Sequence, residues 1–134
     1  MTARAAFADL NDLIGRPYRY GARGPAEFDC WGLVLEVRRR LGLATPPDFA
    51  TRVLAPEHAR ALFRDNRPSG WELVAPRHGA IAYAAAQAHA GVLVAGRVVH
   101  AVRGSGVVAW SLGRWLAEYG EPLEFYEWQM SSFC

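Results

Sequence analysis

One cysteine of this chain stands where the sequence predicts the start of a helix, and a cysteine in that position can serve as a nucleophile. Between Cys30 and Gly42 the apolar residues recur at helical spacing, and they are Leu33, Val34, Val37 and Leu41. Asp29 is a favoured N-cap residue, which puts Cys30 in the first turn. Backbone N–H groups and the positive end of the helix dipole favour a nucleophilic thiolate there. A buried structural cysteine is the alternative, unless the chain also supplies a base.

Two of the four histidines lie in one predicted hairpin and could supply that base. Ala95-Gly96 is a natural two-residue turn, and it sets a register in which Gly91 faces His100. Side chains alternate along a strand, so His89 shares a face with His100 as its diagonal neighbour, and Gly91 leaves space for both rings. One imidazole that orients a second beside a thiolate is the arrangement of cysteine hydrolases. Two unrelated histidines, each satisfied separately, are the alternative.

The other polar residues indicate no metal, cofactor or nucleic-acid partner. His58 and His78 fall in a polar helix and a turn, and we expect both at the surface. The chain has no CxxC and no HExxH pattern, so we expect neither a metal site nor a cofactor. The net charge of +2 is too balanced to indicate nucleic-acid binding. We expect the run Arg38–Arg40 on the solvated face of the helix that follows Cys30.

The order of predicted elements indicates an α+β fold in one domain over residues 1–134. We expect a helix over Ala3–Ile14 with Ala6, Leu10, Leu13 and Ile14 inward, a loop over Arg16–Phe28 and a short helix over Glu57–Arg64. Later segments predict a helix over Leu112–Tyr119 and strands over Glu72–Val74, Gly79–Ala84, Ala88–Val94, Arg97–Val102, Gly106–Trp110 and Leu123–Trp128. This order predicts an antiparallel meander with the helices packed on one face.

The first thirteen residues contain Asp9 and Asp12 and no apolar run, so they resemble neither a signal peptide nor a membrane anchor. We therefore expect synthesis in the cytoplasm, no membrane partner, and a carrier for any action outside the cytoplasm. The two cysteines, Cys30 and Cys134, do not make a disulfide framework.

Four segments of the chain, in order and well spaced, resemble the NlpC/P60 family. They are Gly15–Gly21, Phe28–Val34, His89–Val92 and Val99–Ala101, and the resemblance covers residues 7–110. Members of this family are papain-like cysteine peptidases that cleave peptide stems of bacterial cell-wall peptidoglycan. The resemblance therefore implies a papain-like α+β fold and hydrolysis of a stem amide bond, after D-glutamate and toward the diamino acid.

The resemblance also implies a role for each matching residue. Cys30 matches the nucleophile, His89 the general base, and His100 the third polar residue that orients the base. Tyr18, twelve residues before Cys30, matches a tyrosine whose hydroxyl helps the oxyanion site. The backbone N–H of Cys30 is a further oxyanion donor. A loop aromatic that packs on the core is the alternative for Tyr18.

Two positions depart from the family pattern. Trp31 stands where the family usually has serine, and it resembles the type found in phage tails and tail-like particles. Gly79-Ala80 stands where Gly-Asp commonly opens the first sheet strand of the family. The missing aspartate removes a structural contact or a contact with the substrate, and leaves the catalytic residues in place. Besides peptidoglycan stems we therefore expect tail or tail-like-particle proteins as partners, with action from such a particle in the periplasm or cell wall.

Two other functions fit the same residues. One is a structural tail component with little or no hydrolysis, and the other is a cysteine amidase with another substrate. An aromatic C-terminal stretch is a candidate contact with a particle, because aromatic residues are favoured in interface cores. Its members are Phe125, Tyr126, Trp128 and Phe133, which could equally complete the sheet and its core.

Overall fold

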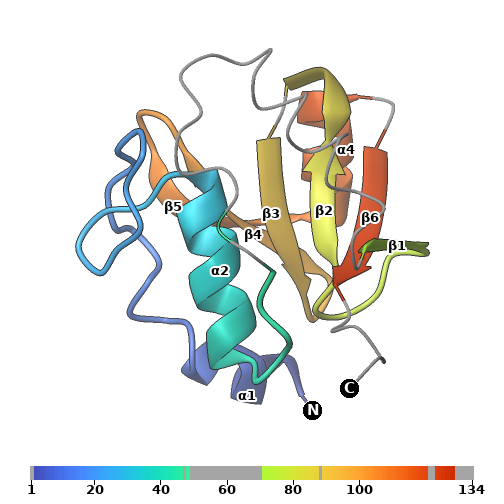
Figure 1. Cartoon of the computed structure of the whole chain (residues 1–134), viewed down its shortest axis with the longest axis horizontal. Coiled ribbons are helices and arrows are strands. Elements are labelled where there is room, and N and C mark those ends of the chain that lie inside the picture. The colour runs from blue at the N-terminus through green and yellow to red at the C-terminus, as the bar shows by residue number, and fades with distance from the viewer. Residues whose placement is uncertain (1, 47, 49–70, 88, 121–122, 129–134) are drawn as a thin grey trace.

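The computed structural model describes residues 2–46, 48, 71–87, 89–120 and 123–128, and these form an α+β structure (Figure 1). Its elements are α1 Ala3–Ala8, α2 Cys30–Arg40, β1 Trp71–Val74, β2 Ile81–Ala84, the 3-10 turn η1 Ala85–Gln87, β3 His89–Val94, β4 Arg97–Val102, β5 Gly106–Ser111, α4 Leu112–Tyr119 and β6 Leu123–Trp128. The predicted helix over Glu57–Arg64 lies outside the described residues. None of the described helices combines the length and apolarity needed to cross a membrane.

Six strands form one antiparallel sheet in the order β1-β6-β2-β3-β4-β5. Strands β2 to β5 make the predicted meander, but β6 returns to lie between β1 and β2, so the prediction of a simple meander is wrong there. Phe125 and Tyr126 are adjacent in β6 and each is only 6% exposed. Because successive side chains point to opposite faces, this strand is buried on both sides, which suits an interior position.

That position bears on two members of the aromatic C-terminal stretch. Phe125 and Tyr126 belong to the core on either side of the sheet, so these two complete the fold. Trp128 ends β6 and is partly buried, and Phe133 lies outside the described residues.

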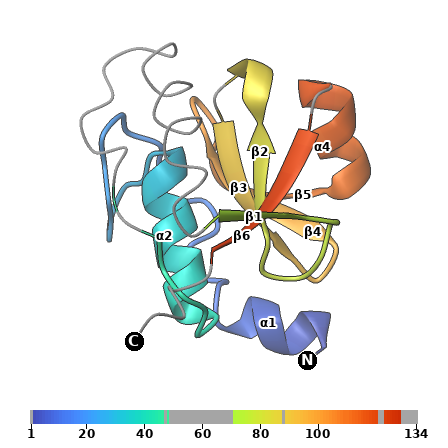
Figure 2. The ribbon, with the colours of Figure 1, turned by 45° about the vertical axis from the view of Figure 1, so that its right-hand side comes forward.

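Helices cover both faces of the sheet, so the prediction that they share one face is wrong (Figure 2). Helices α1 and α2 pack on the face that carries Val92, Val99 and other aliphatic residues. Helix α4 packs on the opposite face through Trp115, its one buried residue. The strands under Trp115 carry small side chains, among them Ala82 and Ala84, and these leave room for the indole.

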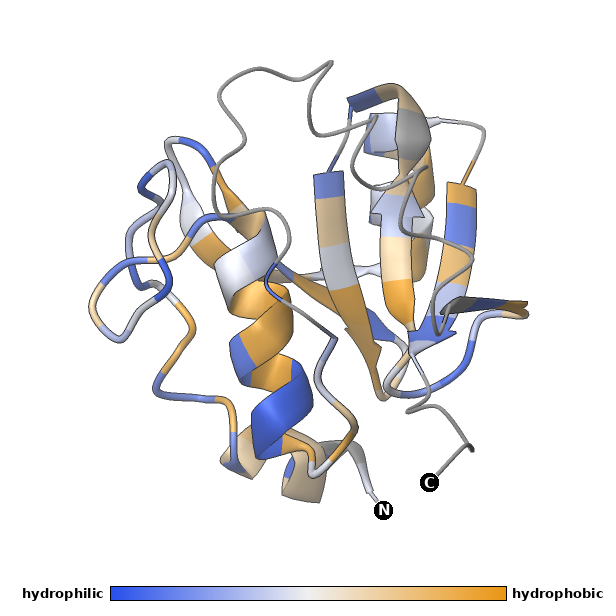
Figure 3. Ribbon diagram, in the orientation of Figure 1, coloured by the Kyte–Doolittle hydropathy of each residue, from blue (hydrophilic) through white to orange (hydrophobic). Residues whose placement is uncertain are grey.

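Helix α2 begins as the sequence predicts. The Asp29 carboxylate accepts a hydrogen bond from the Gly32 N–H at 2.7 Å and so caps the first turn. Leu33, Val34 and Val37 are fully buried against the sheet, and the middle of the helix is hydrophobic in Figure 3.

The expectation of a solvated Arg38 is wrong. Arg38 lies four residues after Val34 on the inward face and is 0% exposed. Its guanidinium pairs with Glu127 at 2.7 Å and donates to the carbonyls of Gly79 and Ala44. The arginine fork has enough donors to satisfy several acceptors at once, which permits its burial.

Helix α1 is shorter than the predicted Ala3–Ile14 segment. It ends at Ala8, and turns lead from there to Gly15. The polar residues Asp9, Asn11 and Asp12 occupy these turns, and such side chains compete with the helical backbone for hydrogen bonds. Leu10 and Leu13 are still fully buried, whereas Ile14, which we expected inside, is 40% exposed.

Candidate active site

The hairpin of β3 and β4 has the predicted register. Val94 pairs with Arg97 across a two-residue turn, in which Ala95 has φ 48° and Gly96 has φ 86°. A side chain at Gly91 would not fit, because a Cβ there would lie 2.9 Å from the Cβ of His100. The glycine therefore makes the space that the second histidine needs.

The two histidines of this hairpin are hydrogen-bonded to each other. His89 Nε2 and His100 Nδ1 lie 2.8 Å apart, so the predicted diagonal contact is confirmed. His89 opens β3 and is partly buried, whereas His100 is 0% exposed in the middle of β4. Because Nε2 of His89 is used in this bond, Nδ1 is the ring nitrogen that remains to take up a proton.

Three aromatic rings enclose the histidine pair on the face that α4 covers. The centroid of the Trp110 ring lies 4.4 Å from that of His100, and the Trp115 ring lies 4.9 Å from it. The ring of Tyr119, the last residue of α4, lies 5.1 Å from that of His89. Burial in this setting lowers the pKa of His89 to about 4 and that of His100 to about 3, so both rings are neutral at pH 7.

The surroundings of His100 bear on which tautomer the pair adopts. His100 Nε2 is buried and has no hydrogen-bond partner among the described residues. An N–H at this atom would meet electron-rich aromatic rings, which accept N–H groups, whereas a bare lone pair would be left unsatisfied. The enclosure therefore favours a proton on His100 Nε2. The proton between the rings then belongs to His89 Nε2, and His89 Nδ1 keeps the lone pair that a base requires.

The aromatic enclosure was not part of the sequence prediction, although the sequence holds a signal for it. His100 pairs with Val108 in the β4–β5 register, and the alternation of side chains then places Trp110 on the same face. Extending the histidine argument across this second hairpin would have found Trp110. Trp115 and Tyr119 come from α4, whose position over the opposite face has no comparable local signal.

Cys30 is the first residue of α2, and α2 and β3 begin at the same end of the molecule (Figure 1). The backbone N–H of Ala90, the residue after His89, acts on the Cys30 sulfur. The structure therefore brings the predicted cysteine to the start of the strand that carries the predicted base.

The prediction of a thiolate at the helix start is wrong for this structure. Cys30 is partly exposed as a residue, but burial of its thiol raises the pKa to about 11, and the neighbouring Asp29 carboxylate adds to the rise. The N–H groups of Ala90 and Trp31 lower the pKa but do not outweigh these two effects. The resting state at pH 7 is thus a thiol beside a neutral imidazole pair.

Tyr18 interacts electrostatically with Cys30. It is partly buried in the loop before α2, and burial together with the charge of a Cys30 thiolate raises the pKa of its phenol. The hydroxyl therefore stays protonated at neutral pH and can donate a hydrogen bond. A donor beside the attacking sulfur is what an oxyanion site requires.

A salt bridge holds the loop that leads into Cys30. Arg23 pairs with the second oxygen of Asp29 at 2.6 Å and with Asp48 at 2.8 Å. Gly32 faces the backbone of Ala22 so closely that a side chain there would collide with it. The N-cap, the loop and the first turn of α2 are thus packed as one piece.

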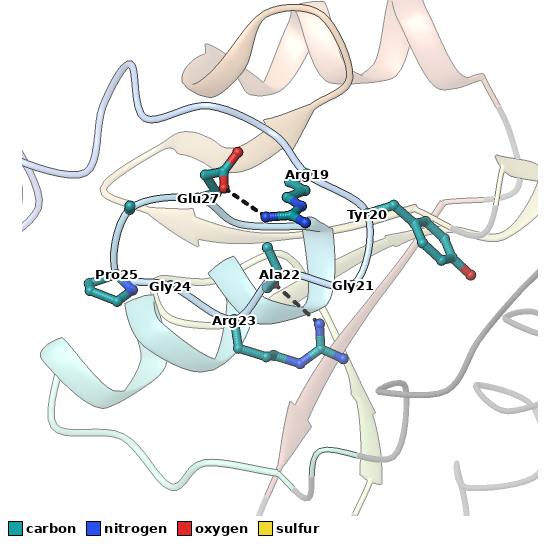
Figure 4. A pocket seen from close by; sticks show the side chains of 9 residues that line it. Arg19, Tyr20, Gly21, Ala22, Arg23, Gly24, Pro25 and Glu27 are labelled. Atoms are coloured by element: carbon teal, nitrogen blue, oxygen red, sulfur yellow. Dashed lines mark hydrogen bonds and ion pairs between the residues drawn. The ribbon is translucent and has the colours of Figure 1, made fainter.

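Of two hollows that described residues form in this part of the molecule, one contains a candidate catalytic residue. The smaller, of about 250 Å³, is lined by Tyr18, Gln87, His89, Ala101, Val102, Arg103 and Tyr119. The larger, of about 400 Å³, is formed by the loop residues 19–27, where Arg19 pairs with Glu27 at 3.4 Å (Figure 4). None of the candidate catalytic residues lines the larger one, whereas the smaller one can place a substrate beside His89.

Of the two other histidines, His78 lies away from this site. His78 is exposed and accepts a hydrogen bond from the Ala95 N–H at 3.0 Å, and His58 lies outside the described residues. Within the described residues no group of histidine, cysteine and carboxylate side chains could hold a metal ion.

Known proteins are similar to this chain in sequence. A family model described as "NlpC/P60 family" matches residues 15–115. The "Probable endopeptidase p60" of Listeria grayi is 40% identical over 48 residues, which make up 36% of this chain and 9% of that protein. This chain therefore corresponds to a small part of that relative's length.

Solved structures show the same fold. The NlpC/p60 domain of the peptidoglycan hydrolase SagA has a TM-score of 0.56 at 20% identity, covering 97% of this chain and all of that domain. NlpC2 from Trichomonas vaginalis has a TM-score of 0.60 at 21% identity, covering 93% of this chain and 45% of that protein. The predicted papain-like α+β fold is thereby confirmed.

Proposed function

This chain belongs to the NlpC/P60 family, and on that premise we propose that it is a cysteine peptidase that hydrolyses an amide bond in the peptide stem of peptidoglycan. The hydrogen bond of 2.8 Å between His89 and His100 is the observation that carries the proposal. This bond leaves Nδ1 of the neutral His89 imidazole available at the start of β3, near Cys30. A nucleophile, a base and a residue that orients the base are the parts such a hydrolysis needs.

The reaction has two halves. As the Cys30 sulfur attacks the carbonyl carbon, the thiol proton passes to Nδ1 of His89, which becomes an imidazolium. The tetrahedral intermediate collapses when this imidazolium protonates the leaving amine, and a thioester to Cys30 remains. Water then attacks the thioester with His89 as base, which releases the acid and restores the thiol.

The oxyanion of each tetrahedral intermediate needs donors that are already in place. The backbone N–H of Cys30 and the hydroxyl of Tyr18 are our candidates, since the first belongs to the nucleophile itself and the pKa of the second responds to the charge on the sulfur. The loss of one such donor typically costs about 100- to 1000-fold in kcat. Because burial keeps both the thiol and the imidazole neutral at rest, the thiol proton must pass to His89 during the catalytic cycle before the thioester forms.

For the scissile bond we propose the amide between D-glutamate and the diamino acid, as the family resemblance implies. The test is incubation of the purified chain with muropeptides of known stem sequence, followed by mass analysis of the fragments. Products that end in D-glutamate are expected. Cys30→Ala is the matched control, because it removes the sulfur and leaves the fold unchanged. Fragments cut elsewhere, or equal products from Cys30→Ala, would contradict the proposal.

We further propose that the chain works as part of a phage tail or tail-like particle that opens the cell wall locally. The support is Trp31, which follows the cysteine where serine is usual and packs in the core at 1% exposure. The measurement is mass spectrometry of purified particles from a host that carries the gene, followed by the muropeptide assay on those particles. Active particles without this chain would disprove the proposed setting and leave the proposed chemistry intact.

A further inference from the structure

Arg103 is the charged side chain in the hollow beside His89. It lies in the turn between β4 and β5, three residues after His100, and it is exposed. The other lining residues are neutral at pH 7, because burial lowers the pKa of His89 to about 4 and the rest carry amide, hydroxyl or apolar groups. This hollow of about 250 Å³ therefore has a positive group and no negative one in its wall.

Within the part of the chain that the structure describes, the guanidinium of Arg103 hydrogen-bonds the Tyr18 side chain and forms no ion pair. Its central carbon lies 5.8 Å from the centroid of the Tyr18 ring, a cation–π contact with a residue of the site. Seven other arginines do form ion pairs among the described residues: Arg16, Arg19, Arg23, Arg38, Arg39, Arg40 and Arg77. An arginine fork that lacks a carboxylate inside the protein can accept one from a ligand.

We propose that Arg103 is the specificity-determining residue that binds a carboxylate of the substrate next to the scissile bond. The inference rests on the proposed function and sharpens it. A glutamyl residue has two carboxyl groups, one of which forms the scissile amide while the other is either free or amidated. Arg103 selects stems in which this second group is a free carboxylate, since a neutral carboxamide gains no charge-assisted pair with the guanidinium.

Two synthetic stem peptides that differ only at this group test the inference. One has the free carboxylate on its D-glutamyl residue, and the other has the carboxamide. The wild-type chain should cleave the carboxylate peptide about 10- to 100-fold faster in kcat/KM, as hydrogen bonds to a charged group predict. Arg103→Ala should lower that rate to the rate of the carboxamide peptide, and Arg103→Lys should keep part of the preference. Arg97→Ala, which removes an exposed arginine at the other end of β4, should leave both rates unchanged.

A binding measurement separates this inference from the proposed hydrolysis. Cys30→Ala cannot form the thioester, so titration of this variant with both peptides, followed by NMR, reports binding alone. We expect tighter binding of the carboxylate peptide, and loss of this preference in the Cys30→Ala, Arg103→Ala double variant. Selective binding without cleavage by the wild type would refute the hydrolysis and keep the carboxylate site. Equal binding of the two peptides, or an equal loss for both on Arg103→Ala, would overturn the carboxylate site.

Discussion

The two faces of the sheet are built from different side chains, although the same strands form both. Under α1 and α2 most of the buried side chains are aliphatic, with Leu33, Val34 and Val92 fully buried, and four aromatic residues complete that core: Phe28, Trp31, Tyr83 and Tyr126. Under α4 the strands carry alanines and the histidine pair, and aromatic rings fill the remaining space. The first face therefore provides stability through aliphatic burial, and the second provides a buried polar pair whose protonation the surrounding rings control.

The catalytic proposal depends on the place where these two regions meet. The cysteine comes from α2 on the aliphatic side, and its partner comes from the first residue of β3 on the aromatic side. Changes on the aromatic side should therefore reduce turnover, and changes on the aliphatic side should reduce stability. Each prediction below tests that division.

The largest expected effect is on turnover. His89→Ala removes the base, so kcat/KM on a muropeptide should fall by at least about 10⁴-fold, as for the removal of a member of a catalytic triad. His100→Ala should cost less, about 10- to 100-fold, because water or a neighbouring polar group can partly replace an orienting residue. His100→Asn should keep more activity than His100→Ala. The free energy of unfolding, measured by urea titration, should fall by only about 1–3 kcal/mol in His89→Ala, the cost of leaving His100 Nδ1 without its partner.

The contrary outcome is equally definite. If His78→Ala removed activity and His89→Ala did not, both the site and the division between the faces would be wrong.

The next effect is on stability. Leu33 is 0% exposed under the sheet, so Leu33→Ala should lower the free energy of unfolding by about 2–5 kcal/mol. The folded fraction should keep its kcat, because Leu33 does not line the hollow beside His89. Leu116→Ala, on α4 with 44% of its surface exposed, is the matched control and should change stability by less than about 0.5 kcal/mol. A larger effect at Leu116 than at Leu33 would reverse the assignment of the faces.

The sequence predicted what local periodicity can encode. The start of α2, the β3–β4 register and the histidine pair all follow from spacing within one short segment, and all three were confirmed. The same holds for the bounds of α4 and β6, which the structure reproduces residue for residue.

What the sequence did not predict depends on distant segments. The place of β6 between β1 and β2 and the side on which α4 packs are set by tertiary contacts. The buried Arg38 depends on Glu127, which lies far along the chain in β6. The pKa of Cys30 was misjudged because the helix dipole can be inferred locally, whereas the burial that outweighs it cannot.

The third prediction uses pH to test the aromatic face. Burial lowers the pKa of His89 to about 4 and that of His100 to about 3, from an ordinary value of 6.5. Between pH 6.5 and these lower values the unfolded chain binds protons on the two histidines that the folded chain does not. The stability that the neutral pair contributes is therefore complete above pH 6.5, is lost as the pH falls from 6.5 through 4, and levels off below 3. Urea titrations at several pH values should show this loss. His100→Asn should fall less steeply, and an identical slope in both proteins would mean that His100 is not a buried neutral base.

The smallest expected effect concerns the tautomer of the histidine pair. If aromatic rings accept the N–H of His100, ¹⁵N NMR of the imidazoles should show protons on Nε2 of both His89 and His100 at pH 7. Trp110→Phe keeps a ring and should keep this pattern, whereas Trp110→Leu should populate the form in which His89 is protonated on Nδ1. That form cannot take the proton of Cys30, so kcat should fall about two- to fivefold, in line with an N–H···π contact of about 0.5–1 kcal/mol. A wild-type spectrum with His89 protonated on Nδ1 would show that the aromatic side does not prepare the base, and substrate binding would then have to shift the tautomer before the sulfur attacks.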